Sequence, residues 1–201
     1  MSETPSAEQR VAELESRLEQ EVGRFKRLVE VATTLSSTLN LDELLATIMS
    51  SATELVAAET SSLLLLDEQT NELSFAVVDG DVATLLSDQK IPVGQGIAGW
   101  ALSNGVAAIV DNPATDPRFY QGADSASGFV TRSLVAIPLI VKDRPVGVVE
   151  MINKIGADGF SPLDVEIGEA LASFAAVAID NANMYARLAE AVVTARLSYR
   201  L

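Results

Sequence analysis

The stretch SLVAIPLIVKDRPVGVVEMIN, residues 133–153, carries the strongest strand signal in the chain. Two apolar runs rich in Val and Ile, residues 133–141 and 145–153, flank the polar segment 142–144. β-Branched runs on either side of a short polar connection are typical of two strands joined by a turn. The stretch therefore predicts two neighbouring antiparallel strands.

The residues upstream of this stretch predict three further strands. Residues 61–66 and 72–78 form two apolar runs around a polar turn, and residues 107–110 form a third, shorter run. Alternation within the second run predicts one shared face, made of Leu73, Phe75 and Val77. The chain thus contains enough strands for one antiparallel sheet.

Helix signals lie on both sides of the strands. Asn40 is a good N-cap with Glu43 at the third helical position, which predicts a helix to about residue 58. Ser161 or Pro162 begins the last predicted helix, which runs to the end of the chain.

Two segments show heptad spacing. In the first, residues 7–40, the a and d positions are Val11, Leu14, Leu18, Glu21, Phe25, Leu28, Ala32 and Leu35. In the last helix they are Leu171, Phe174, Ala178, Asn181, Tyr185, Leu188, Val192 and Ala195. This spacing predicts coiled-coil seams of a parallel homodimer. For the first segment, a helix docked on its own domain is the alternative. The predicted fold class is α+β, an antiparallel sheet with helices packed on one face and coiled-coil helices at both ends.

Composition excludes several classes of function. The 201 residues include no Cys and no His, which removes the usual zinc ligands, His-based triads and His-ligated haem. The net charge of −14 argues against nucleic acid and anionic membrane as partners. The N-terminus has no apolar signal-peptide core, and the longest purely apolar run is too short to span a membrane, so we expect a cytoplasmic protein.

A glycine motif stands in IPVGQGIAGWA, residues 91–101. Gly94, Gly96 and Gly99 match G-x-G-x-x-G, but Pro92 makes the preceding run a poor central strand, and no acidic residue follows at the dinucleotide-binding spacing. Residues 97–102 predict a short helix, whose first N–H groups can receive an anion. The alternative is that the glycines only allow a tight turn. Trp100 is predicted to lie in the core.

Glu150 is the most conspicuous charged residue in the predicted strands. It shares a strand face with Val148 and Ile152, where an ionised carboxylate is costly unless it is paired. Either this face is a pocket floor, or it is solvated and the opposite face, with Val149 and Met151, points to the core. No second carboxylate stands at a spacing that suggests an acid–base pair, so we expect no enzyme activity.

Residues 111–132 predict a long loop rich in hydrogen-bonding groups, with one helical turn near 117–121. After the last strand, Lys154 and Asp164 are positioned to pair and to pin the last helix to the end of that strand.

Five strings in order resemble a GAF domain, a small-molecule sensor module, over about residues 41–183. They are SSLLLLD, VVDGD, IPVGQGIAGWALSNG, DPRFYQGADSASGFVTRSLVAIPL and GVVEMINK. The chain is most similar to the GAF domains that bind cyclic nucleotides in phosphodiesterases and cyanobacterial adenylyl cyclases. The resemblance divides the chain into an N-terminal tail and coiled-coil helix (1–40), the GAF sensor domain (41–183) and an outgoing signalling helix (184–201).

The resemblance also implies site residues, in a pocket between the sheet and the long loop. The implied ligand-binding residues are Ser62, Val78, Asp79, Ile97, Ala98, Tyr120, Asp124, Ser127, Thr131 and Glu150. The implied lid-supporting residues are Asn153, Lys154, Phe160 and Asp164. The sequence departs from the group at three positions: Val165 stands where Glu is usual, Val78 where some members place an aromatic residue, and Ser127 where Thr is common.

The resemblance implies a sensor that binds cAMP or cGMP under a lid and relays its state through a dimeric coiled coil. The alternative is a GAF domain with another ligand or none, acting as a dimerisation and relay element. A methionine-sulfoxide reductase of this fold would need cysteines, which the chain lacks. No cofactor or metal is expected, and the sequence leaves open both the choice between cAMP and cGMP and the downstream effector.

Overall fold

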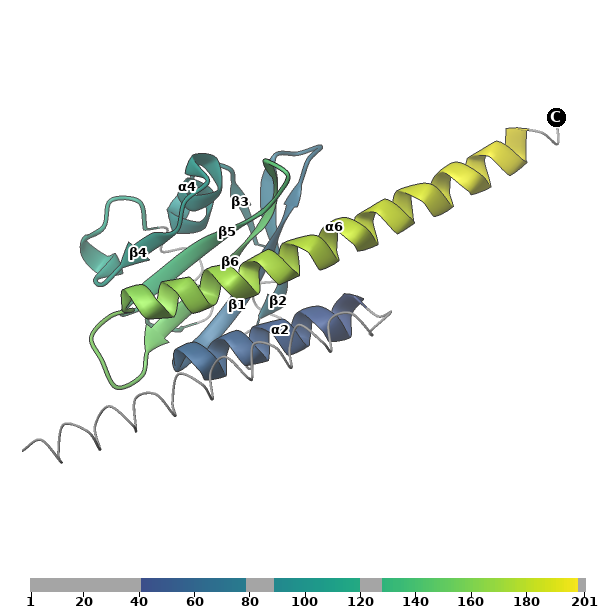
Figure 1. Cartoon of the computed structure of the whole chain (residues 1–201). Helices are drawn as coiled ribbons and strands as arrows, with labels where there is room; N and C mark the ends of the chain where they lie inside the picture. The colour runs from purple at the N-terminus through teal and green to yellow at the C-terminus, as the bar shows by residue number, and fades with distance from the viewer. Residues whose placement is uncertain (1–40, 79–88, 120–127, 199–201) are drawn as a thin grey trace, which may run out of the picture. The chain divides into compact units, whose positions relative to one another are not determined.

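The computed structural model describes residues 41–78, 89–119 and 128–198 (Figure 1). Its helices are α2 (Leu41–Val56), α4 (Gly96–Asn104), the 3₁₀ turn η1 (Pro113–Thr115) and α6 (Pro162–Ser198). Its strands are β1 (Ala58–Asp67), β2 (Glu72–Val78), β3 (Lys90–Pro92), β4 (Ala108–Val110), β5 (Leu134–Val141) and β6 (Arg144–Lys154). The predicted coiled-coil segment 7–40 lies outside the described residues.

The strands form one sheet in the order β3-β2-β1-β6-β5-β4, and every neighbouring pair is antiparallel. The predicted hairpin is confirmed as β5 and β6, with Val141 paired to Arg144. Its connection is two residues long, Lys142 and Asp143, and both have positive φ (48° and 65°). Such a turn matches the twist of antiparallel strands. Pro92 lies in the edge strand β3, where a missing N–H is tolerated.

Helices cover both faces of the sheet, whereas the sequence predicted helices on one face only. Ser61 of β1 faces α2, since its hydroxyl lies 2.6 Å from Thr53 Oγ1. The helix α6 packs on the same face, because Gly168 lies against Ile137 and Met151. The short helix α4 covers the opposite face (Figure 1). The prediction that the helices lie on one face is therefore confirmed for α2 and α6 and is wrong for α4.

A bulge in the β1–β2 pair changes which residues share a face. Leu64 pairs with Phe75, but Leu63 pairs with Val77, so Ala76 has no counterpart on β1. Because successive residues alternate between faces, Val77 turns to the face opposite that of Phe75. The predicted common face for Phe75 and Val77 is therefore wrong.

The helix ends follow the local sequence. Ser161 caps α6: its hydroxyl accepts the Asp164 N–H at 3.2 Å, and Asp164 Oδ2 accepts the Ser161 N–H at 2.8 Å. This reciprocal arrangement is a capping box. Gly105 ends α4 in the left-handed conformation, which favours glycine. In the part of the chain that the structure describes, no helix has the length and apolar character needed to cross a lipid bilayer.

Candidate ligand-binding site

A row of four residues crosses the middle of the sheet on one face. The strand registers pair Val78 with Ser62, Ser62 with Glu150, and Glu150 with Ala136. Directly paired residues project from the same face of a sheet. We call these four residues the floor row. The bulge at Ala76 is what brings Val78 into it, because unbroken alternation from Phe75 would turn Val78 to the other face.

Glu150 lies in the floor row among apolar neighbours. The face that α4 covers carries the buried side chains of Leu64 and Val148 and the partly buried Ile152. Glu150 itself is half-buried, and its Oε2 accepts a hydrogen bond from the Ser62 hydroxyl at 3.2 Å. The opposite face, with Met151, is also buried. Both faces of the sheet are therefore covered, so neither is simply solvated. The Glu150 carboxylate lies on the face that α4 covers.

The glycine motif builds a tight turn against the start of α4. Gly94 and Gly96 have φ values of 90° and 67°, which favour glycine. A Cβ on Gly99 would lie 2.9 Å from both Gly94 N and Pro92 O, so this position also needs a glycine. Gly94 N–H in turn donates to Gly99 O at 3.1 Å. The turn alone therefore accounts for all three glycines.

The same turn leads into α4, whose start packs on the floor face. Ile97 and Ala98 are almost fully buried and belong to the apolar cluster that contains Val148 and Ala136. Their amides stand in the first helical turn, where an α-helix has no acceptor of its own. Backbone donors at this position can bind an anion without any basic side chain.

The first described part of the long loop is fixed to α4. Arg118 lies over the ring of Trp100, with its guanidinium carbon 4.5 Å from the ring centroid. Asp116 accepts hydrogen bonds from Arg118 Nε at 3.0 Å and Nη2 at 2.7 Å, which lower the pKa of Asp116 and raise that of Arg118. Trp100 is half-buried rather than fully in the core. The structure describes a 3₁₀ turn at η1, Pro113–Thr115, and a turn in which Phe119 N–H donates to Asp116 O at 3.0 Å. The predicted helical turn near 117–121 lies partly outside the described residues.

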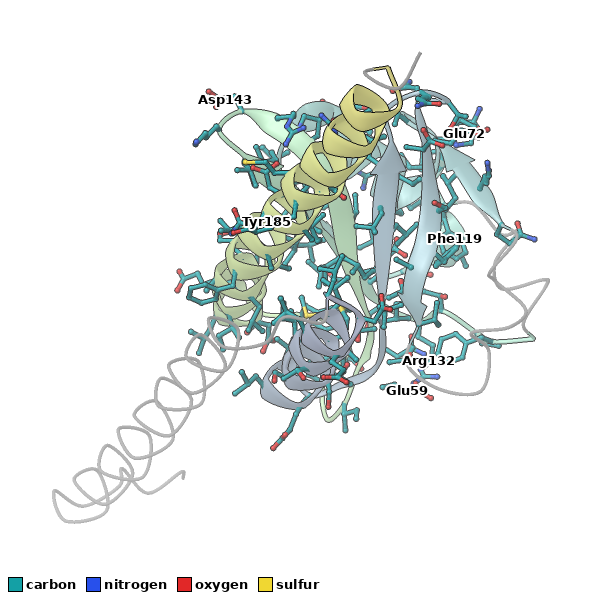
Figure 2. All side chains as sticks on the ribbon, turned by 90° about the vertical axis from the view of Figure 1, so that its right-hand side faces the viewer. Glu59, Glu72, Phe119, Arg132, Asp143 and Tyr185 are labelled. Atoms are coloured by element: carbon teal, nitrogen blue, oxygen red, sulfur yellow. The ribbon has the colours of Figure 1, made fainter. Side chains whose placement is uncertain are left out.

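The far end of the loop is tied to Asn153. This side chain is 1% exposed, and its Oδ1 accepts the Arg132 N–H at 2.6 Å. Its Nδ2 donates to Val130 O at 3.0 Å and to Glu59 Oε2 at 2.8 Å. Arg132 and Glu59 form an ion pair across the same point (Figure 2). Sequence reasoning missed Glu59 and Arg132, because their pairing depends on strands distant in the chain.

Lys154 and Asp164 form a sheltered joint between three elements. Lys154 Nζ donates to Asp164 Oδ1 at 2.9 Å and to Val56 O, at the end of α2, at 2.6 Å. Burial raises the pKa of Asp164, but hydrogen bonds from Lys154 and Ser161 outweigh it, so the pKa lies below its ordinary value. The predicted pair is present. The Lys154–Asp164 pair contacts α2 and α6. The side chain that contacts the long loop is that of Asn153.

Of the remaining predicted site residues, two are described by the structure and four are not. Thr131 is half-buried between the anchored residues Val130 and Arg132, and Phe160 is buried. Four predicted ligand-binding residues lie outside the described part of the chain: Asp79, Tyr120, Asp124 and Ser127.

Comparisons with known proteins give the family. A family model described as "GAF domain" matches residues 38–180. A probable 3′,5′-cyclic phosphodiesterase, pde-5, from Caenorhabditis elegans is 29% identical over 75% of this chain and 22% of its own length. The mouse cone cGMP-specific 3′,5′-cyclic phosphodiesterase subunit alpha′ is 35% identical over 44% of this chain and 10% of its own length. The chain therefore spans less than a quarter of either relative.

Solved structures confirm the fold. The GAF domain of a phosphoenolpyruvate-protein phosphotransferase from Coxiella burnetii has a TM-score of 0.74 and 16% identity, over 82% of this chain and 96% of that one. A free methionine-R-sulfoxide reductase from Neisseria meningitidis has a TM-score of 0.67 and 19% identity, over 81% and 91% of the two chains. With its six-stranded antiparallel sheet and the family match over residues 38–180, the chain belongs to the GAF domain family.

Proposed function

We propose that this GAF domain is a sensor that binds cAMP or cGMP above the floor row. The observation that carries the proposal is the half-buried Glu150 carboxylate, which lies beside the buried Ser62 hydroxyl on an otherwise apolar face. A polar pair within an apolar surface suits a ligand that combines a flat, weakly polar base with a few N–H donors. The two phosphodiesterase relatives support the choice of ligand class.

Each part of the proposed site has a role. Glu150 accepts N–H groups of the base, and Val78 packs against its flat face. The amides of Ile97 and Ala98 donate to the cyclic phosphate, which local backbone donors can hold although the chain is acidic overall. Thr131 lies in the segment tied down by Asn153 and stays a predicted ligand contact. Asp79, Tyr120, Asp124 and Ser127 also stay predictions.

We propose binding without catalysis. The chain contains no His and no Cys, so Ser62 has no imidazole partner to activate it as a nucleophile. Its hydroxyl donates to Glu150 from within the sheet, which is a positioning contact.

We also propose that the domain relays its state as a parallel homodimer. On the side turned away from the sheet, α6 exposes large apolar side chains at helical spacing: Phe174 (39%), Val177 (52%), Met184 (60%) and Tyr185 (74%; Figure 2). Exposed apolar side chains in one stripe of a helix suit a coiled-coil seam. This stripe also favours the second candidate function, a dimerisation and relay element without this ligand.

Titration calorimetry with cAMP and cGMP tests the proposal, with 5′-AMP and 5′-GMP as controls that keep the base and open the cyclic phosphate. We expect heat from at least one cyclic nucleotide and a higher melting temperature. Ligand at 100 times its Kd stabilises the folded state by about 2.7 kcal/mol. No heat and no thermal shift with either cyclic nucleotide would reject the ligand, and the relay element would remain.

A further inference from the structure

The described side chains in the second half of α6 contact the domain through charge rather than through buried apolar groups. Among the α6 side chains that the structure describes, Ile179 is the last fully buried one. Asn183 and Arg187, further along, are exposed. Apolar packing therefore fixes the first half of α6, whereas the contacts described for the next turns are polar.

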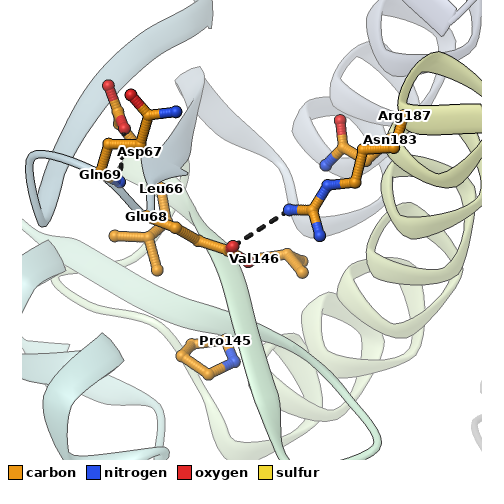
Figure 3. A pocket seen from close by; sticks show the side chains of 8 residues that line it. All are labelled: Leu66, Asp67, Glu68, Gln69, Pro145, Val146, Asn183 and Arg187. Carbon is orange, nitrogen blue, oxygen red and sulfur yellow. Dashed lines mark hydrogen bonds and ion pairs between the residues drawn. The ribbon is translucent and has the colours of Figure 1, made fainter. Parts of the chain in front are cut away.

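Glu68, in the turn between β1 and β2, is the centre of these contacts. Its Oε1 accepts a hydrogen bond from Arg144 Nη1 at 3.1 Å. Its Oε2 accepts one from Arg187 Nη2 at 3.0 Å, which Figure 3 shows. Arg144, the first residue of β6, also pairs with Asp180 of α6. We call these four residues the charge latch. It joins the β1–β2 turn, the start of β6 and the outgoing half of α6.

The charge latch spans a gap rather than a packed contact. A cavity of about 290 Å³ lies beside it, between the β1–β2 turn and α6. Its walls include Leu66, Val146 and Asn183 (Figure 3). A helix that contacts the domain through ion pairs beside a cavity can shift without disturbing close-packed side chains. A helix that is packed in a core can shift only if the surrounding side chains repack.

We propose that the charge latch sets the exit direction of α6 and passes to it any movement of strand β1. This strand contains Ser62 of the floor row and ends at Asp67, directly before Glu68. Five residues of strand cover roughly 17 Å, so a shift at the floor row reaches the latch through one rigid element. The role in relay rests on the proposed function. Exposed ion pairs are each worth little, which suits a contact that must open and close.

Distance measurement by pulsed electron paramagnetic resonance tests the latch in the ligand-free protein. The chain has no cysteine, so Thr70→Cys and Asn183→Cys place nitroxide labels on the turn and on α6 uniquely. Labelled protein is mixed with an excess of unlabelled protein so that distances within one chain dominate in a dimer. The parent should give one narrow distance distribution.

Glu68→Gln removes the charge shared by both arginines. Of the two arginines only Arg187 lies on α6, so the variant removes one exposed ion pair between the turn and this helix. We expect the population with a displaced helix to rise roughly 1.4- to 5-fold, as the loss of one exposed ion pair predicts. Arg187→Gln should act in the same direction, and 1 M salt, with a Debye length of about 3 Å, should broaden the parent distribution. Glu166→Gln is the matched control, because Glu166 is exposed near the start of the same helix, about 30 Å of helix from Arg187. Identical distributions in the parent, Glu68→Gln and Arg187→Gln would overturn the latch.

A second arm adds the cyclic nucleotide that binds in calorimetry. A distance change in the parent that is lost in Glu68→Gln, with affinity retained, supports relay through the latch. An equal change in both proteins overturns that relay. If no cyclic nucleotide binds, the proposed function fails, whereas the ligand-free comparison still decides whether the latch holds α6.

Discussion

Replacing Glu150 with alanine separates a ligand contact from a structural one. In the ligand-free protein the substitution removes the Ser62 hydrogen bond to a charged acceptor, worth about 1.5–3 kcal/mol. It also removes a half-buried carboxylate from an apolar face, which recovers a desolvation cost of similar size. The two effects oppose each other, so we expect the free energy of unfolding to change by less than about 1 kcal/mol.

Affinity should respond much more strongly than stability. A lost hydrogen bond between the ligand and a charged group costs about 1.5–3 kcal/mol, which is roughly 10- to 150-fold in Kd. Calorimetry gives the affinity, and urea denaturation of the ligand-free protein gives the stability. Glu72→Ala is the matched control, since Glu72 is also on a strand but pairs with Lys90 at the sheet edge, 3.7 Å away.

A double-mutant cycle sharpens the test. Ser62→Ala and Glu150→Ala should be non-additive in affinity, because the two side chains contact each other and would bind one ligand group together. An unchanged Kd in Glu150→Ala, with the parent binding well, would refute the placement of the ligand on the floor row. A large loss of stability in Glu150→Ala would instead show that the carboxylate is a structural group.

Three other predictions concern the joints around the site. Gly99→Ala should destabilise the domain by about 1–3 kcal/mol in urea, because its Cβ meets Gly94 N at 2.9 Å; an unchanged midpoint would show that the turn can yield. The Lys154–Asp164 joint should stabilise the fold above the ordinary Asp pKa of 3.8 and lose this contribution as the pH falls through the lower folded pKa. The parent should therefore lose more stability than Asp164→Asn in that acid range, because other carboxylates with a lowered pKa, such as Asp116, titrate in both proteins; parallel pH profiles would contradict this. Tyr185→Glu should shift light scattering from about twice the chain mass towards one chain mass, and a parent that is already monomeric would rule out the seam.

Much of the fold follows from local patterns that can be read directly in the sequence. The two apolar runs around residues 142–144 become β5 and β6, because β-branched runs favour strands and a short polar segment favours a turn. The Ser161 cap and the Gly105 stop mark helix ends for similar local reasons. These signals depend on contacts between residues a few positions apart.

Parts of the candidate site follow only from pairing between distant segments. Nothing local marks the bulge at Ala76, yet it decides that Val78 rather than Val77 joins the floor row. Glu59 and Arg132 meet only because β1 and β6 bring Asn153 between them.

Local sequence is sufficient for the order and type of most elements and for the anomaly of a carboxylate at Glu150, because periodicity, capping and residue chemistry act within short spans of chain. The family was recognised from the resemblance of five strings in order. The sheet face that α4 covers, the contact between Glu150 and Ser62, and the contact between Glu68 and Arg187 all depend on the tertiary structure. These contacts join residues far apart in the chain, and strand register and helix placement bring them together through the packing of the whole domain.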